Sequence, residues 1–142
     1  MEFKVLNEDE VQTYLTDKRH IVISVQDPDQ PFVQLPEQIS RVGYLRLAFH
    51  DLEFPIPQCK DSNIFNKNHV RQIQEAITYA RNYNYIDLIC VNCVAGMSRS
   101  PAIAAALSYI LNGPGTELYF FGAFTPNNLV FKTIINEWEK KT

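Results

Sequence analysis

Short apolar runs alternate along the chain with segments that have a helical repeat. The runs at 20–25, 42–49 and 86–91 are apolar and partly β-branched, which predicts buried strands. From residue 68, apolar side chains recur every three or four positions and predict an amphipathic helix between the second and third runs. These apolar positions are Val70, Ile73, Ile77 and Ala80. A strand, a helix and a strand in this order predict two strands that pair in parallel.

The segment before the first apolar run predicts a short strand followed by a helix. Residues 3–6 fit a strand. Asn7, with Glu10 three residues later, matches a capping box, so we expect a helix from there to about Asp17.

The remainder of the chain predicts three further helical segments and one loop. Residues 101–111 are rich in Ala, Leu and Ile, as in a buried helix, and residues 118–121 predict a short helical or irregular cover over the core. A last helix is expected from Pro126 onward. Residues 52–66 contain two prolines and several turn-forming residues, which predicts a mobile surface loop.

Composition places these elements in one ordinary domain, residues 1–142. Hydrophobic residues make up 46% of the chain and charged residues 20%, which is typical of a soluble globular protein. We therefore predict a single α/β domain with a central, mainly parallel sheet of about four or five strands, flanked by helices.

The net charge, and the lack of a membrane-spanning or export pattern in the sequence, indicate which partners and which compartment to expect. The net charge of −3 argues against a nucleic-acid partner. No apolar run reaches the length of a membrane span, so no membrane partner is expected. The first residues lack the basic-then-apolar pattern of an export signal, which favours a cytoplasmic protein.

The most informative stretch runs from Asn92 to Ser100 and connects the third apolar run to the alanine-rich segment. A turn from a strand into a helix directs several backbone N–H groups, and the positive end of a helix dipole, at one point where an anion can bind. Gly96 allows the backbone to turn inward without a Cβ clash. The residues predicted to bind a phosphate group are Val94, Ala95, Gly96, Met97, Ser98 and Arg99.

Three side chains of this stretch carry chemistry. Cys93 begins the loop, and the helix terminus and the guanidinium of Arg99 both favour its thiolate, which is the nucleophilic form. Arg99 can hold two phosphate oxygens with its planar, permanently charged fork. The hydroxyl of Ser100 can hydrogen-bond the sulfur when it leaves. No group of His, Cys and Asp has metal-ligand spacing, so we predict neither a metal nor a cofactor.

The pattern Cys93-x5-Arg99-Ser100 with an internal glycine resembles the signature of the cysteine-dependent protein tyrosine and dual-specificity phosphatases. The resemblance implies hydrolysis of a phosphomonoester through a phosphocysteine intermediate, with a phosphorylated protein as the partner. In that family the residue before the cysteine is usually His, whereas this chain has Asn92.

The resemblance covers the chain unevenly. It is strongest over residues 86–111. Over 20–52 and 125–138, the second of which includes Pro126-Asn127, the chain is similar to small bacterial or viral-type members of the family. The first nineteen residues carry none of the resemblance.

The leaving oxygen needs a proton, and two aspartates compete to donate it. Asp51 follows the end of the second predicted strand, where this family carries its acid on a movable loop. Asp61 has the shorter separation from Cys93 that is typical of compact dual-specificity relatives. We favour Asp51, because loops lengthen more readily than strands relocate, and Asp61 remains the alternative.

Three cysteines, an odd number, do not suggest a disulfide framework. Cys90 and Cys93 form a Cys-x-x-Cys pair, which redox and metal sites also use. Because Cys90 lies inside the predicted strand, we interpret it as a small buried strand residue. Cys59 is either an incidental thiol or a partner that protects oxidised Cys93, and we favour the first.

The sequence thus predicts a metal-independent phosphomonoester hydrolase that acts on phosphotyrosine in proteins, with Cys93, Arg99, Asp51 and Ser100 as catalytic residues. Dual specificity stays open, because cleft depth is not visible in a sequence. One alternative is a pseudophosphatase that binds phosphate without turnover, as Asn92 suggests. Another is a phosphatase of RNA 5′-phosphates or lipid headgroups, which would favour a basic rim. The oligomeric state is open.

Overall fold

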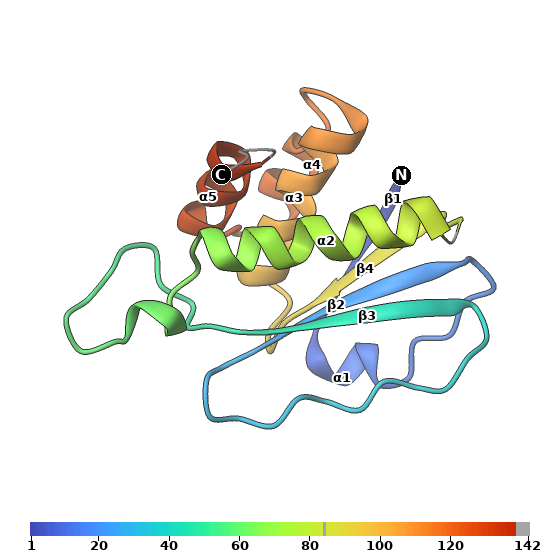
Figure 1. Ribbon diagram of the computed structural model, residues 1–142, viewed down its shortest axis with the longest axis horizontal. Helices are drawn as coiled ribbons and strands as arrows, with labels where there is room; N and C mark the ends of the chain where they lie inside the picture. Colours follow the sequence, from blue (N-terminus) through green and yellow to red (C-terminus); the bar gives the residue numbers. More distant parts are fainter. Residues whose placement is uncertain (84, 139–142) are drawn as a thin grey trace.

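A sheet of four parallel strands with helices on both faces forms the centre of the molecule, as the computed structural model of residues 1–83 and 85–138 shows (Figure 1). The strands are β1 (Glu2–Leu6), β2 (His20–Gln26), β3 (Arg41–Ala48) and β4 (Leu88–Asn92), in the spatial order β1-β4-β2-β3. The helices are α1 (Glu8–Val11), α2 (Lys67–Tyr83), α3 (Arg99–Asn112), α4 (Leu118–Ala123) and α5 (Asn128–Glu137). A 3₁₀ turn, η1, covers Asp61–Asn63. The predicted α/β class and parallel sheet are confirmed.

Both faces of the sheet are buried, as a parallel sheet requires. Side chains alternate along the strands, so that Ile23 and Ile89 belong to a large core cluster with α2, α3 and α5, whereas Val22 and Cys90 belong to a smaller cluster with residues of α1. In Figure 1, α1 accordingly lies on the opposite side of the strands from α2.

β4 lies between β1 and β2, and all of its residues are buried. It begins two residues after the start of the predicted strand and ends at Asn92. The carboxyl ends of all four strands therefore meet at one edge of the sheet, and the predicted phosphate-binding loop leaves from the middle of that edge. In parallel α/β sheets this edge is where ligands bind.

The predicted helix from Asn7 to about Asp17 is wrong in length. The capping box is present, since Glu10 N donates to the Asn7 side chain at 2.7 Å and Asn7 N donates to the Glu10 side chain at 2.9 Å. However, α1 ends at Val11, which is its only buried residue, and Leu15 is 67% exposed. A short helix that has no continuous apolar face to bury is not stable beyond its capped first turn.

The other predicted segments are present with small shifts at their ends. Residues 118–121 lie in α4, the last helix begins at Asn128, and the helix predicted at 101–111 already starts at Arg99. Between β3 and α2 the chain forms a long loop that contains only η1. Within the described ranges, no helix combines the length and the apolar character needed to cross a membrane.

Candidate active site

The loop between β4 and α3 places its glycine against the beginning of the chain. Gly96 has φ +70°, a conformation that residues with a Cβ rarely adopt. A Cβ at this position would also lie 2.9 Å from the backbone nitrogen of Asn7. Glu8 N donates to Val94 O at 3.2 Å, which ties the same loop to the start of α1. The first residues, which carry none of the family resemblance, thus form one wall of the loop.

The sulfur of Cys93 is surrounded by hydrogen-bond donors of its own loop. Gly96 N and Ser100 N donate to Sγ at 3.2 and 3.4 Å, and the Ser100 hydroxyl lies 3.1 Å from it. The side chain is buried, and the N-terminus of α3 begins six residues further on. The predicted nucleophile therefore lies among backbone N–H donors shortly before the start of α3.

Arg99 is held by two neighbouring strands. Its Nη1 donates to the Asp27 carboxylate at 2.7 Å and to Phe49 O at 2.8 Å, and the residue is only 5% exposed. Asp27 follows β2 and Phe49 follows β3. In the described part of the chain Nε and Nη2 make no hydrogen bond, which leaves them for two oxygens of one phosphate group. Sequence reasoning missed the pairing of Asp27 with Arg99.

Asp51 lies against the catalytic loop. Its Oδ1 accepts hydrogen bonds from Ser98 Oγ and from Asn127 Nδ2, both at 2.8 Å. Both donors use one oxygen, and Oδ2 makes no hydrogen bond among the described residues. Asn127 also donates through Nδ2 to Leu52 O at 3.0 Å, and its backbone N–H donates to Ser98 O at 3.0 Å.

Asn127 was not predicted as a site residue, although Pro126-Asn127 belongs to the resemblance. Its side chain is 1% exposed, and its Oδ1 accepts from Val130 N, which caps α5. Thr125 N, two residues earlier, donates to Met97 O at 3.0 Å. Residues 125–127, which lead into α5, therefore hold two segments in place. One contains Asp51 and Leu52, and the other is the end of the loop between β4 and α3.

Asp61, the alternative acid, lies in η1 and is exposed. Its backbone carbonyl accepts from Asn66 Nδ2 at 3.1 Å and from Ile64 N at 3.2 Å. None of its hydrogen bonds within residues 1–83 and 85–138 reaches the catalytic loop. The structure brings Asp51 to the loop and keeps Asp61 in the middle of the connection to α2.

Asn92, where the family usually has His, ends β4 and is 1% exposed. Its Oδ1 has no hydrogen-bond partner among the described residues. The three donors around the Cys93 sulfur all come from Gly96 and Ser100, so residue 92 takes no part in holding the sulfur.

Cys90 lies on the other face of the sheet from Cys93. The two residues belong to different core clusters, and both are free thiols. Burial raises the pKa of the Cys90 thiol to about 12, so it stays protonated at neutral pH. These observations support its interpretation as a packing residue. Cys59 is a free, partly exposed thiol of the long loop.

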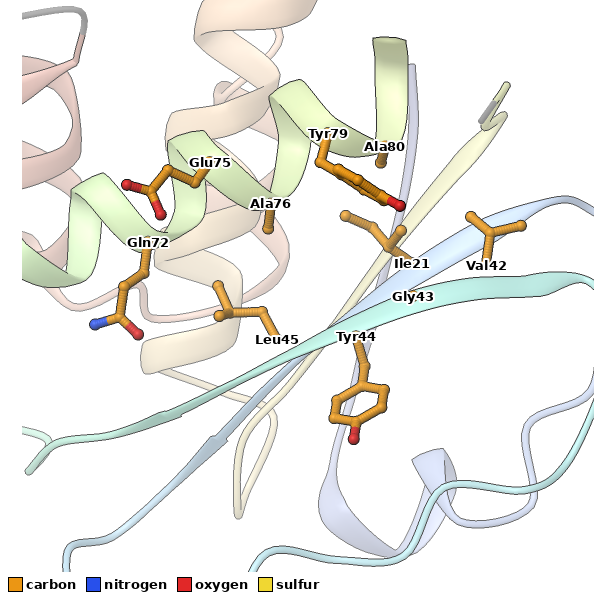
Figure 2. Close-up of a pocket in the computed structure, with 10 residues that line it drawn as sticks. All are labelled: Ile21, Val42, Gly43, Tyr44, Leu45, Gln72, Glu75, Ala76, Tyr79 and Ala80. Carbon is orange, nitrogen blue, oxygen red and sulfur yellow. The ribbon is translucent and has the colours of Figure 1, made fainter. Parts of the chain in front are cut away.

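Two hollows in the surface differ in their relation to the site. One, of about 460 Å³, borders the catalytic loop, and its lining residues are Glu8, Gln26, Asp27, Pro28, Gln30, His50 and Val94. The other, of about 520 Å³, lies between α2 and β3, where Leu45 and Ile21 point toward the helix while Tyr44 points away from it (Figure 2). The second hollow contains none of the candidate catalytic residues. Within the residues that the structure describes, no group of three His, Cys, Asp or Glu side chains could hold a metal ion.

Comparison with known proteins gives structural similarity alone, since no protein-family model and no curated protein matches the chain. Human DUSP28 superposes with a TM-score of 0.63 at 17% identity, over 96% of this chain and 91% of that one. PTPMT1 in complex with PI(5)P gives 0.54 at 14% identity, over 96% and 89%. Tk-PTP in its active form gives 0.51 at 17% identity, over 98% and 91%. The chain therefore has the phosphatase-like α/β fold that its catalytic-loop pattern implied.

Proposed function

We propose that residues 1–142 form a single catalytic domain that hydrolyses phosphotyrosine in proteins through a phosphocysteine intermediate. The observation that carries the proposal is the convergence on one loop of three groups. These are a sulfur with two backbone donors and a hydroxyl 3.1 Å away, an arginine whose Nε and Nη2 make no hydrogen bond among the described residues, and a hydrogen-bonded carboxyl group. The partner is a phosphorylated protein. Because a thiolate nucleophile needs a reducing compartment and the cysteines are free, we place the protein in the cytoplasm.

In the first step, the Cys93 thiolate attacks phosphorus in line with the leaving oxygen. The S–P bond forms while the P–O bond breaks, and the proton on Asp51 Oδ2 passes to the leaving oxygen. The N–H groups of the loop, together with Nε and Nη2 of Arg99, hold the remaining phosphoryl oxygens. These fixed positive groups supply the stabilisation that a metal ion gives in other phosphatases.

In the second step, water attacks the phosphocysteine. The Asp51 carboxylate takes a proton from this water, the new P–O bond forms, and the S–P bond breaks to return the thiolate and inorganic phosphate. The Ser100 hydroxyl, 3.1 Å from Sγ, can donate to the sulfur as its negative charge returns. Each group thus has a defined role in both steps.

The surroundings of the site favour a phosphotyrosine substrate. Met97, within the loop, is 44% exposed, and Phe54, three residues after Asp51, is 68% exposed. Exposed apolar side chains on both segments that form the site suit contact with an aromatic ring. A phosphoserine side chain offers no such ring, so we expect lower efficiency with it.

Carboxylates near the loop argue against RNA and lipid headgroups as substrates. Glu8 and Asp27 line the adjoining hollow. Asp29 is exposed in the connection after β2, and Glu53 is exposed in the connection after β3. Additional phosphate groups of a nucleic acid or an inositol lipid would be repelled there, whereas such substrates favour a basic rim. The neighbour PTPMT1 was solved with PI(5)P, and its similarity to this chain lies in the fold.

The test measures phosphate release from p-nitrophenyl phosphate, phosphotyrosyl and phosphoseryl peptides, a 5′-phosphorylated RNA and PI(5)P, with chelator present. We expect the phosphotyrosyl peptide to be the best of these biological substrates. Cys93→Ser should lower kcat by a factor on the order of 10⁴ to 10⁶, as loss of a nucleophile does. Cys59→Ser, which removes another free thiol, is the matched control and should keep full activity.

Two results would overturn the proposal. No turnover of any substrate by the wild type, with vanadate still binding, would leave the pseudophosphatase alternative. Faster hydrolysis of the RNA or the lipid than of every peptide would replace the substrate class while keeping the chemistry.

A further inference from the structure

The hollow of about 460 Å³ borders the loop that follows β4. Val94 contributes to its lining from the loop itself, Asp27 is the partner of Arg99, and His50 directly precedes Asp51. A phosphate group held by the loop is therefore flanked by this hollow. The residue next to the phosphorylated one is the part of a protein substrate that can enter it.

The lining of the hollow is unbalanced in charge. It contains the carboxylates of Glu8 and Asp27, the amides of Gln26 and Gln30 and the imidazole of His50, but no Lys or Arg. Asp27 shares its Oδ1 with Arg99. Glu8 forms no ion pair within the described part of the chain, and its one side-chain hydrogen bond is a long contact of 3.5 Å from Gln26 Nε2.

The position of Glu8 is fixed at the N-terminus of α1, and no cationic side chain among the described residues forms an ion pair with it. It is the first residue of the capped helix α1, and its backbone N–H donates to Val94 O at 3.2 Å. Its side chain is half-buried, so its carboxylate is less screened by solvent than a fully exposed one. A carboxylate that is held beside a phosphate site without a cation of its own favours a cation supplied by the ligand.

We propose that this hollow binds the side chain of a Lys or Arg that lies next to the phosphotyrosine in the substrate. The proposal rests on the proposed function and narrows its substrate class. The phosphate group binds at Cys93 and Arg99, and the ammonium or guanidinium group lies against Glu8, with the amides of Gln26 and Gln30 as further polar partners. Substrates with acidic neighbours are disfavoured by the same carboxylates.

The experiment compares phosphotyrosyl peptides that differ at one position. Lys, Gln or Glu is placed in turn at each of the two positions before and after the phosphotyrosine, and kcat/KM is measured from phosphate release. At one or more positions we expect Lys to exceed Gln by about fivefold, the scale of a partly exposed ion pair, and Glu to fall below Gln. Raising the ionic strength should reduce the difference.

Variants of Glu8 identify the group responsible. Glu8→Gln should remove most of the preference for Lys, and Glu8→Lys should reverse it in favour of Glu. The matched control is Glu75→Gln, which removes an exposed carboxylate from the separate hollow between α2 and β3 (Figure 2) and should leave the preference unchanged.

The outcomes separate this inference from the proposed function. Equal kcat/KM for Lys, Gln and Glu peptides at every position in the wild type would overturn the subsite. A preference that Glu8→Gln leaves intact would overturn it as well. Neither result touches the proposed function, which fails only if the wild type hydrolyses none of the peptides and no p-nitrophenyl phosphate.

Discussion

The proposed nucleophile, Cys93, and the proposed acid, Asp51, are held in different ways. Every hydrogen bond to the Cys93 sulfur comes from within seven residues of it. Asp51 is held by Ser98 and Asn127, which are 47 and 76 residues away in sequence. The nucleophile is therefore placed by one turn of the backbone, and the acid by the packing of the whole domain.

The phosphate-binding turn and the position of the acid therefore depend differently on the folding of the rest of the domain. A strand-to-helix turn with a glycine forms the anion site wherever that turn forms. The acid reaches the site only after the chain on both sides of it has packed. Loss of long-range packing should therefore reduce proton transfer before it reduces phosphate binding.

After Cys93→Ser, the largest effect is expected from a change of the proposed acid. Asp51→Asn removes the proton donor and should lower kcat by about 10² to 10⁴ and abolish the basic limb of the pH–rate profile. Phosphate or vanadate affinity should change little, because the loop is intact. Asp61→Asn is the matched control and should retain both rate and profile. If Asp61→Asn instead loses the basic limb, the acid has been assigned to the wrong aspartate.

The next effect concerns a contact between the loop that follows β4 and the beginning of the chain. Gly96→Ala forces a Cβ into a φ of +70° and against Asn7 N at 2.9 Å, and it should lower the free energy of unfolding by about 1–3 kcal/mol. Gly115→Ala has a similarly positive φ but open space around its Cβ, so it measures the strain alone. Urea denaturation compares the two. Equal losses would show that the contact with Asn7 adds nothing.

A smaller effect is expected from the residue that positions the acid. Asn127→Ser keeps an oxygen for the cap of α5 but is too short to reach Asp51, and it should lower kcat about tenfold, the scale of one hydrogen bond to a charged group. The loss should be greater for a phosphoseryl peptide than for p-nitrophenyl phosphate, since a poor leaving group needs the proton more. An equal loss for both substrates, or a raised KM alone, would contradict this role.

The smallest effect should come from His69, which packs against both ends of the loop between β3 and α2. The ring of His69 lies 5.3 Å from Phe49 and 5.2 Å from Phe65, at the two ends of the loop, and its Nδ1 accepts from Asn66 N at 3.0 Å. Burial lowers the pKa of His69 below its ordinary value of 6.5. As pH falls through this value, the unfolded chain binds a proton at His69 before the folded protein does. The free energy of unfolding therefore decreases as pH falls.

Urea midpoints at pH 7.5 and 5.5 test this linkage. The wild type should lose stability at the lower pH, and His69→Gln should lose less between the two pH values. Burial also lowers the pKa of His20, so part of the dependence should remain in the variant. An unchanged pH dependence in His69→Gln would show that His69 does not contribute.

The sequence predicted the site as far as its contacts are local. The apolar runs identified β2, β3 and β4, and the Cys93-to-Ser100 spacing identified the turn, because both patterns express short-range geometry. The helix predicted to Asp17 failed because propensity and a capping box do not show whether a buried face exists. The pair Asp27–Arg99 and the contact of Gly96 with Asn7 join residues that only the strand order brings together.

Asn127 also sets the order in which the activity can arise during synthesis. Cys93, Arg99 and Asp51 all leave the ribosome before residue 127, and the sheet is complete once β4 has joined β1 and β2. A nascent chain that has emerged only as far as α4 contains Ser98 but not Asn127, so it lacks one of the two side chains that hold Asp51. The second hydrogen bond to Asp51 can therefore form only after the strands and the loop that follows β4 have been synthesised.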